Sequence, residues 1–140
     1  MSVDPEVVRL ARGKNFAVLS VLLASGRPMA HVMWVDADDE HVLINTEVHR
    51  AKYRAVQRDP RVTVTIWERD NPYRFAEVRG RVVETVTGPV ARAHIDELSR
   101  KYRGRDYDDA SITSERVLLR IAPDRQHVRG PHRTDSGSRR

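Results

Sequence analysis

The basic stretch 49–54 is the part of the chain whose residue types could most readily do chemistry. It follows an expected strand, begins an expected helix, and carries cations at Arg50, Lys52 and Arg54. A helix start presents unpaired backbone N–H groups and positive dipole density, and both favour a phosphate. Arg adds a planar fork for phosphate oxygens, and Lys adds a compact charge. The stretch is therefore a candidate phosphate-binding site.

The spacing of these cations leaves two interpretations open. Residues two apart on a regular helix point in nearly opposite directions, so Arg50 and Lys52 can reach one phosphate only if Arg50 lies at or before the first turn. Arg50, Arg54 and Arg58 stand four apart, which is the spacing of a solvated helix face. Taken alone, the spacing favours the solvated face.

The other candidate groups are weaker. The six histidines show no pair at helical ligand spacing, so no metal site is expected. His31 could hydrogen-bond a substrate or be a satisfied histidine of the core. The acidic turn 36–39 lacks the glutamate of a calcium loop. Serine stands in no nucleophile elbow, and the absence of cysteine excludes disulfides, thiolate metal sites and cysteine nucleophiles. Trp34 and Trp67 could stack on a ring, although aromatics in a small barrel usually only pack.

Length and composition indicate one soluble domain. The chain has 140 residues, of which 39% are hydrophobic and 32% charged. No apolar run reaches the length of a membrane span, and the N-terminus lacks the basic and apolar regions of a signal peptide. Together with the absence of cysteine, these features predict a cytoplasmic protein with no membrane partner.

The net charge of +5 is concentrated at the C-terminus. Residues 129–140 contain four Arg and one Asp, which leaves the preceding 128 residues with only +2. Polyanion binding needs several clustered cations. The sequence therefore predicts no nucleic-acid partner for the domain at 1–128, and a disordered basic tail at 129–140.

Hydrophobic patterning predicts short antiparallel strands in the first half of the chain. Asp4 and Pro5 should start a helix that Gly13 ends. The apolar run 15–23 is expected to be a strand buried on both faces. Turns at 24–28 and 36–39 would separate strands at 29–35 and 41–45, and a helix at 49–58 would stop at Asp59-Pro60.

The second half continues with strands around one longer helix. Residues 61–67 alternate, Asn71-Pro72 should form a turn, and Gly80 should mark a bend or bulge in the next strand. A helix is expected from Gly88-Pro89 to Gly104, then an acidic loop at 105–113 and a last strand at 117–121. About six antiparallel strands with inserted helices predict an α+β fold built on a closed or nearly closed β-barrel.

Five motifs in order carry a family resemblance that covers about residues 5–130. The chain resembles the pyridoxamine-phosphate-oxidase-like split β-barrel superfamily, and more closely its F420-dependent branch, the flavin/deazaflavin oxidoreductase B group. The motifs are Gly26-Arg27-Pro28, Met33-Trp34-Val35, Arg50-Ala51-Lys52, Arg58-Asp59-Pro60-Arg61-Val62 and Glu77-Val78-Arg79-Gly80.

The resemblance implies a cofactor site. It places the ribityl phosphate on the segment Arg50-Ala51-Lys52 and the ribityl chain beside Asn45 and Thr46. The ring would lie along the second strand, where this chain has His31-Val32 in place of a frequent Ser-Pro. A homodimer partner would complete the pocket. The ring contacts that the resemblance implies are Met29, Ala30, His31, Val32 and Met33, and the partner contributors are Tyr73, Arg74 and His127. Trp67, which could stack on a ring, is a further candidate for cofactor binding.

The resemblance also implies a function: an F420H2-dependent oxidoreductase that transfers a hydride to a small organic acceptor. The acidic tail of F420 would suit the arginines near the site, Arg54, Arg58 and Arg74. An FMN-dependent oxidase or reductase of the same fold, a non-catalytic F420 carrier and a nucleic-acid-binding module are the alternatives.

Overall fold

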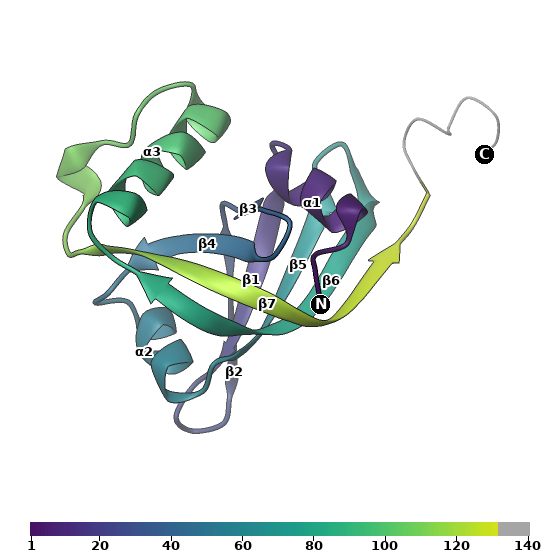
Figure 1. The fold of residues 1–140 in the computed structure, drawn as a ribbon, viewed down its shortest axis with the longest axis horizontal. Coiled ribbons are helices and arrows are strands. Elements are labelled where there is room, and N and C mark those ends of the chain that lie inside the picture. Colours follow the sequence, from purple (N-terminus) through teal and green to yellow (C-terminus); the bar gives the residue numbers. More distant parts are fainter. Residues whose placement is uncertain (132–140) are drawn as a thin grey trace.

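A strongly curved antiparallel sheet of seven strands forms the body of the protein, as Figure 1 shows for the computed structural model, which describes residues 1–131. The strand order is β2-β1-β5-β6-β7-β4-β3. The remaining residues of the expected tail, 132–140, lie outside the described part of the chain. The strands are β1 (Phe16–Leu22), β2 (Pro28–Met33), β3 (Asp36–Ala37), β4 (Val42–Glu47), β5 (Arg61–Glu68), β6 (Asn71–Val86) and β7 (Arg116–Arg129). The helices are α1 (Pro5–Arg12), α2 (Ala51–Arg58), α3 (Pro89–Arg103) and the short 3₁₀ turn η1 (Asp109–Ser111).

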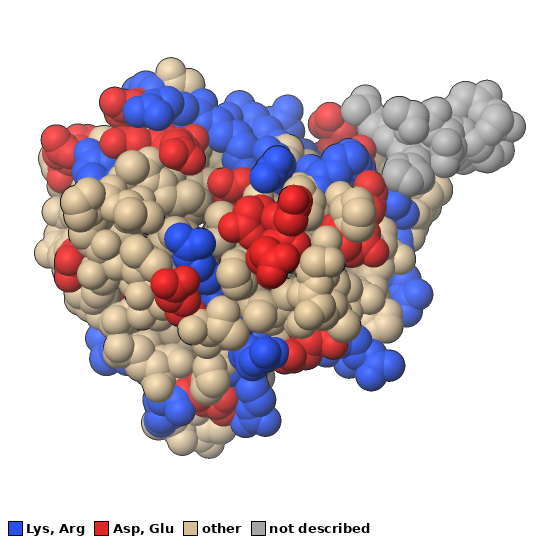
Figure 2. All heavy atoms as spheres, viewed as in Figure 1, with Lys and Arg blue, Asp and Glu red and all other residues tan. Residues whose placement is uncertain are grey.

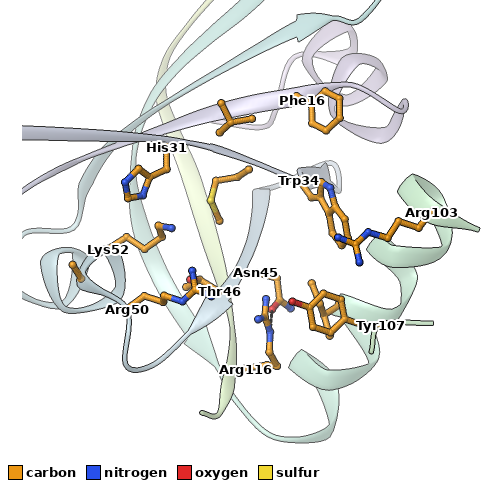
Figure 3. A pocket seen from close by; sticks show the side chains of 14 residues that line it. Phe16, His31, Trp34, Asn45, Thr46, Arg50, Lys52, Arg103, Tyr107 and Arg116 are labelled. Atoms are coloured by element: carbon orange, nitrogen blue, oxygen red, sulfur yellow. Dashed lines mark hydrogen bonds between the residues drawn. The ribbon is translucent and has the colours of Figure 1, made fainter. Parts of the chain in front are cut away.

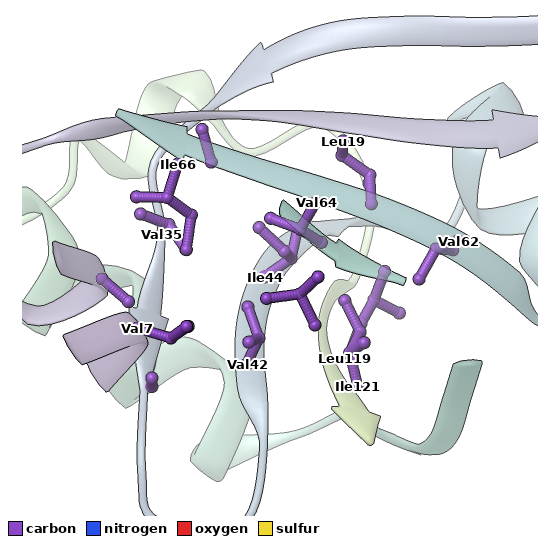
Figure 4. Close-up of a cluster of buried hydrophobic side chains, with 14 of the residues drawn as sticks. Val7, Leu19, Val35, Val42, Ile44, Val62, Val64, Ile66, Leu119 and Ile121 are labelled. Atoms are coloured by element: carbon purple, nitrogen blue, oxygen red, sulfur yellow. The ribbon is translucent and has the colours of Figure 1, made fainter. Parts of the chain in front are cut away.

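The hydrophobic core lies inside the curve of the sheet (Figure 4). Alternation in β5 builds it as expected, because Val62, Val64 and Ile66 are buried. In β1, however, only every second residue is buried. Ala17 and Leu19 face the core, whereas Phe16 is partly exposed. The expectation of a strand buried on both faces was therefore wrong, and the outer face of β1 remains apolar and accessible.

The sheet bends at Gly80, which confirms the expected irregularity. The pairing of β6 with β7 shifts register between Arg79 and Gly80. A Cβ at Gly80 would lie 2.2 Å from the carbonyl oxygen of Ala122. Only glycine permits this approach, and the bulge lets the 16-residue β6 curve around the core.

Helices α1 and α3 begin and end where their capping residues predict. The Asp4 side chain accepts a hydrogen bond from the Glu6 backbone N–H at 2.8 Å, and α1 buries Val7 and Leu10 in the core. Gly104 ends α3 in the left-handed conformation. One face of α3 is buried and includes Ala91, Ile95, Leu98 and Tyr102.

A lysine of α3 joins this helix to α1 and to the segment between β2 and β3. The Lys101 ammonium donates to the carbonyl oxygens of Ala11, at the end of α1, and Val35, at distances of 2.9 and 2.6 Å. Burial lowers the pKa of Lys101 to about 8, against a smaller opposing effect of Asp36. This contact fixes α3 beside the segment that links β2 to β3.

Several expected boundaries were wrong where pairing overrode local signals. Asn71-Pro72 opens β6, and the turn lies at 69–70. Asp36 and Ala37 pair with β4 as strand β3. β7 continues beyond 121 to Arg129, because its polar second half pairs with β6. Helix α2 starts at Ala51, two residues later than expected.

Acidic and basic side chains are interspersed over the face shown in Figure 2. Among the described residues, no helix is long and apolar enough to cross a membrane.

Replacing Gly80 by Ala is expected to lower the free energy of unfolding by about 3 kcal/mol, because the new methyl group meets a backbone carbonyl that is fixed in the sheet. Gly26→Ala is the control: Gly26 has a φ of +88° but no atom within 4 Å, so only about 1 kcal/mol should be lost. Urea unfolding measures both variants. Equal losses would contradict the close contact between β6 and β7.

Candidate functional site: a pocket lined by cations and aromatic rings

A pocket of about 610 Å³ opens between β2, the end of β4, the start of α2 and the C-terminal end of α3 (Figure 3). No acidic residue is among those that line it. Its lining residues are Phe16, His31, Val32, Met33, Trp34, Asn45, Thr46, Arg50, Ala51, Lys52, Ile95, Arg103, Tyr107 and Arg116.

The structure gathers most of the residues expected to bind a cofactor, although they are distant in sequence. Those that line the pocket are His31, Val32, Met33, Asn45, Thr46, Arg50, Ala51 and Lys52. Those that do not are Met29, Ala30, Arg54, Trp67, Tyr73 and Arg74.

The expected residues outside the pocket have other surroundings in the chain. The Arg54 guanidinium donates to the His49 carbonyl oxygen. The Trp67 ring packs against Phe16, with ring centres 6.4 Å apart. Arg74 forms an ion pair with Glu6 at 2.9 Å. Tyr73 is largely exposed at the start of β6, and His127 pairs with Glu77 in the sheet.

Arg50 occupies the position that a shared phosphate site requires. It is the N-cap residue of α2, with extended backbone angles, and Lys52 lies in the first turn. No side chain caps the helix, and no acidic residue lies in its first turn. The cations that spacing alone would place on different faces therefore both line the same pocket.

Lys52 is a buried cation without an anionic partner. Its exposed fraction is 7%, and within residues 1–131 no hydrogen bond or ion pair engages its ammonium group. Burial lowers the pKa of Lys52, and the positive charges of Arg50 and Arg116 lower it further. A bound anion would offset all three effects, so the site is built to receive negative charge.

Glu47 holds the wall behind these cations. Its side chain is fully buried, and Oε1 accepts hydrogen bonds from the backbone N–H groups of Thr113 and Ser114 at 3.1 and 2.7 Å. Oε2 accepts from Arg116 at 3.0 Å. Burial would raise the pKa of Glu47, but these hydrogen bonds outweigh it and lower the pKa. A charged carboxylate thus fixes Arg116 and the loop before β7.

Asn45 orients Arg116 from the other side. Its Oδ1 accepts from Arg116 Nε at 2.9 Å, and its Nδ2 lies 3.0 Å from the Ala91 carbonyl oxygen and 3.1 Å from His94 Nδ1. With both amide hydrogens engaged, Asn45 is a positioning residue for Arg116 rather than a donor to a ligand.

Aromatic rings form the wall next to α3. Trp34 stacks on Tyr102 with ring centres 5.1 Å apart, and Tyr107 meets it edge-on at 6.2 Å. The Tyr102 hydroxyl donates to the Asn15 carbonyl oxygen and accepts from the Val35 N–H. The Arg103 guanidinium lies 5.0 Å from the Trp34 ring centre. The result is a fixed aromatic wall in which the Tyr107 ring stands perpendicular to the stacked pair of Trp34 and Tyr102.

The sequence did not predict part of this lining, namely Phe16, Ile95, Arg103, Tyr107 and Arg116, and for Trp34 it favoured packing over contact with a ring. Arg103 is exposed at the end of α3 and also lines the pocket. An arginine directly before an apolar strand was the available signal for Arg116. Nothing local marked the others, because the fold of α3 over β4 brings them to the site. Among the described residues, no group of three His, Asp or Glu side chains could hold a metal ion.

Comparison with known proteins identifies the family. The chain belongs to the pyridoxamine 5'-phosphate oxidase family, whose model matches residues 3–129. This confirms the predicted split-barrel superfamily and fold. No curated protein matches the sequence.

Solved structures share the fold over nearly the whole chain. An F420 reductase is 27% identical with a TM-score of 0.78, covering 89% of this chain and 98% of its own. A conserved hypothetical protein of Mycobacterium tuberculosis is 22% identical with a TM-score of 0.73, covering 93% and 89%. A haem storage protein of Vibrio cholerae is 14% identical with a TM-score of 0.63, covering 93% and 96%. The last two show the fold alone.

Glu47→Gln is expected to lower the free energy of unfolding by about 3 kcal/mol at pH 7, because Arg116 loses its buried counter-charge. The folded-state pKa of Glu47 lies below its ordinary 4.5, so its contribution is complete above that pH and is lost as the pH falls through the folded-state pKa. The difference between wild type and variant should therefore narrow in acid.

Urea unfolding from pH 7 down to pH 3 measures this difference. Glu84→Gln is the control, because Glu84 pairs with Arg120 while its side chain is 59% exposed, and it should cost less than about 1 kcal/mol. A Glu47→Gln deficit that stays constant with pH would argue against a charged buried carboxylate.

Proposed function

We propose that this protein is an F420H2-dependent oxidoreductase that transfers a hydride to a small organic acceptor. The observation that carries the proposal is the buried, unpartnered Lys52 beside the N-cap Arg50 in a pocket lined by no acid. The F420 reductase that is 27% identical over 98% of its length supports a deazaflavin as the ligand. Membership of the pyridoxamine 5'-phosphate oxidase family supports a flavin-type cofactor more generally.

The residues of the pocket fit such a cofactor in kind. Lys52, Arg50 and the start of α2 would hold its phosphate. The Thr46 hydroxyl would hydrogen-bond the ribityl chain, because the side chain of Asn45 is already hydrogen-bonded to Arg116 and His94. His31, Val32 and Met33 on β2, together with the aromatic wall, would face the ring.

The acidic tail distinguishes F420 from FMN, and exposed arginines on α2 would bind it. Arg54 and Arg58 are exposed, and each donates one N–H to a backbone carbonyl oxygen, of His49 and of Leu22. The planar guanidinium keeps further donors for a carboxylate. Arg74 is tied to Glu6 away from the pocket of its own chain, so it is no part of this tail site within one protomer.

When bound and reduced, F420 would supply a hydride to the acceptor and release a proton to solvent, while the reduced acceptor would take up one proton from solvent. The protein's part is to bind and to orient. Lys52 and Arg50 would anchor the phosphate, and the aromatic wall would limit the orientations of the acceptor beside Trp34. The partner subunit proposed below would cover the pocket and so exclude water. No side chain needs to act as an acid or base.

We also propose a homodimer in which the partner covers the pocket. Val32 is 63% exposed, and in the sheet it lies directly beside Val18, whose other neighbour is Thr65. These residues belong to the outer face of β1, β2 and β5, where Phe16 is also partly exposed. A β-branched and aromatic face beside an open pocket is suited to pairing with a second copy.

Lys52→Met should weaken F420 binding at least tenfold, because the methionine fills similar space without the charge that faces the phosphate. Lys14→Met is the control, since Lys14 lies after α1 and outside the pocket lining. Titration with F420, followed by intrinsic Trp fluorescence, gives both dissociation constants. Equal affinity of Lys52→Met and wild type would refute the phosphate anchor.

The same titration with FMN separates the two cofactors. The proposal predicts that F420 binds more tightly than FMN, and that Arg54→Met weakens F420 binding while leaving FMN binding unchanged. Tighter FMN binding would support an FMN-dependent enzyme of the same fold. Bound F420H2 with no turnover of any acceptor in a broad panel would support a carrier.

Val32→Asp should convert the dimer to monomers, because it places a carboxylate on the apolar face. Val83→Asp is the matched control, since Val83 is also exposed, at 47%, but lies on β6 away from that face. Sedimentation equilibrium measures the mass of each variant. A wild type that sediments as a monomer, or a Val32→Asp dimer, would exclude this interface.

A further inference from the structure

The proposed cofactor site leaves one cation of the pocket without a role. Arg103 lies in the last turn of α3, and in Figure 3 it reaches the pocket from the side opposite Lys52 and Arg50. Two cationic ends thus flank the aromatic wall, and the cofactor phosphate accounts for only one of them.

The acids near Arg103 are already paired with other arginines. Asp106 accepts from Arg100 Nε at 2.6 Å, and Asp96 accepts from Arg92 at 2.7 Å. Within residues 1–131, no ion pair or hydrogen bond engages the Arg103 guanidinium. Its charge is therefore left for a ligand in the pocket.

Arg103 is also held in place before any ligand binds. Its guanidinium lies 5.0 Å from the ring centre of Trp34, which stacks on Tyr102. A cation–π contact uses the face of the guanidinium and leaves its edge N–H groups as a fork. A planar fork beside an aromatic wall matches a carboxylate joined to a conjugated group.

We propose that Arg103 determines acceptor specificity and selects planar, conjugated acceptors that bear a carboxylate. The carboxylate binds the edge of Arg103, and the conjugated part lies along Trp34 and Tyr107. This inference rests on the proposed function, because it assigns the second ligand of the same pocket.

A carboxylate at Arg103 could come from the acceptor or from the acidic tail of F420. The tail is bonded beyond the phosphate, and so belongs on the side of Lys52 and α2. Arg103 stands on the other wall, which favours the acceptor as the source. The experiment has one arm for each.

The first arm measures binding of trans-cinnamate and methyl trans-cinnamate to the F420-loaded protein by calorimetry. Wild type should bind the acid about tenfold more tightly than the ester. Arg103→Met should abolish this preference and leave the ester affinity unchanged. Arg100→Met is the control, because Arg100 lies on the same helix outside the pocket, and it should keep the preference.

The second arm measures the affinity of wild type and Arg103→Met for F420 with one glutamate and with several. Unchanged affinities support the acceptor assignment. If Arg103→Met binds F420 more weakly than wild type does, and the loss of affinity grows with the number of glutamates, Arg103 binds the cofactor tail and the proposal is overturned. Three results of the first arm would also overturn the proposal. Arg103→Met could keep the preference for the acid, wild type could bind acid and ester equally, or wild type could fail to bind cinnamate up to its solubility limit. Failure of wild type to bind F420 would overturn the proposed function itself, and it is detected before cinnamate is added.

Discussion

The buried carboxylate of Glu47 is the interaction on which the functional end of this protein depends. Glu47 is the last residue of β4. Its carboxylate accepts hydrogen bonds from the backbone N–H groups of residues 113–114 and pairs with Arg116 at the start of β7. Without that counter-charge, Arg50, Lys52 and Arg116 would meet around one pocket with no anion among them. With it, Arg116 is paired at 3.0 Å and held at the wall, Arg50 has a longer ion pair at 3.9 Å with the same carboxylate, and Lys52 alone of the three has no anionic partner among the described residues.

The curvature of the sheet decides where that charge lies. The bulge at Gly80 lets β6 and β7 wrap the core, which brings the start of β7 beside the end of β4. Helix α3, fixed through Lys101 and Tyr102, then adds an aromatic wall across the opening. Cations on two sides and rings between them are the physical reason the pocket suits a long anionic ligand with a planar head.

The sequence predicted the parts of this arrangement that local chemistry determines. Alternation located β5, capping residues located α1 and α3, and Gly80 marked the bend. The interpretation of the basic stretch depended on where α2 begins, and Arg50 is its N-cap. Long-range pairing was beyond local signals: the polar half of β7 is a strand only because β6 lies beside it. Arg103 and Tyr107 reach the pocket for the same reason, since their neighbours come from distant segments.

A crystal structure of the protein with F420 bound tests the central claim most directly. The account predicts a phosphate oxygen of the cofactor at about 2.7–3.2 Å from Lys52 Nζ, beside Arg50, with the ring against β2 and the aromatic wall. A phosphate bound elsewhere, with the Lys52 ammonium still unpartnered, would contradict it.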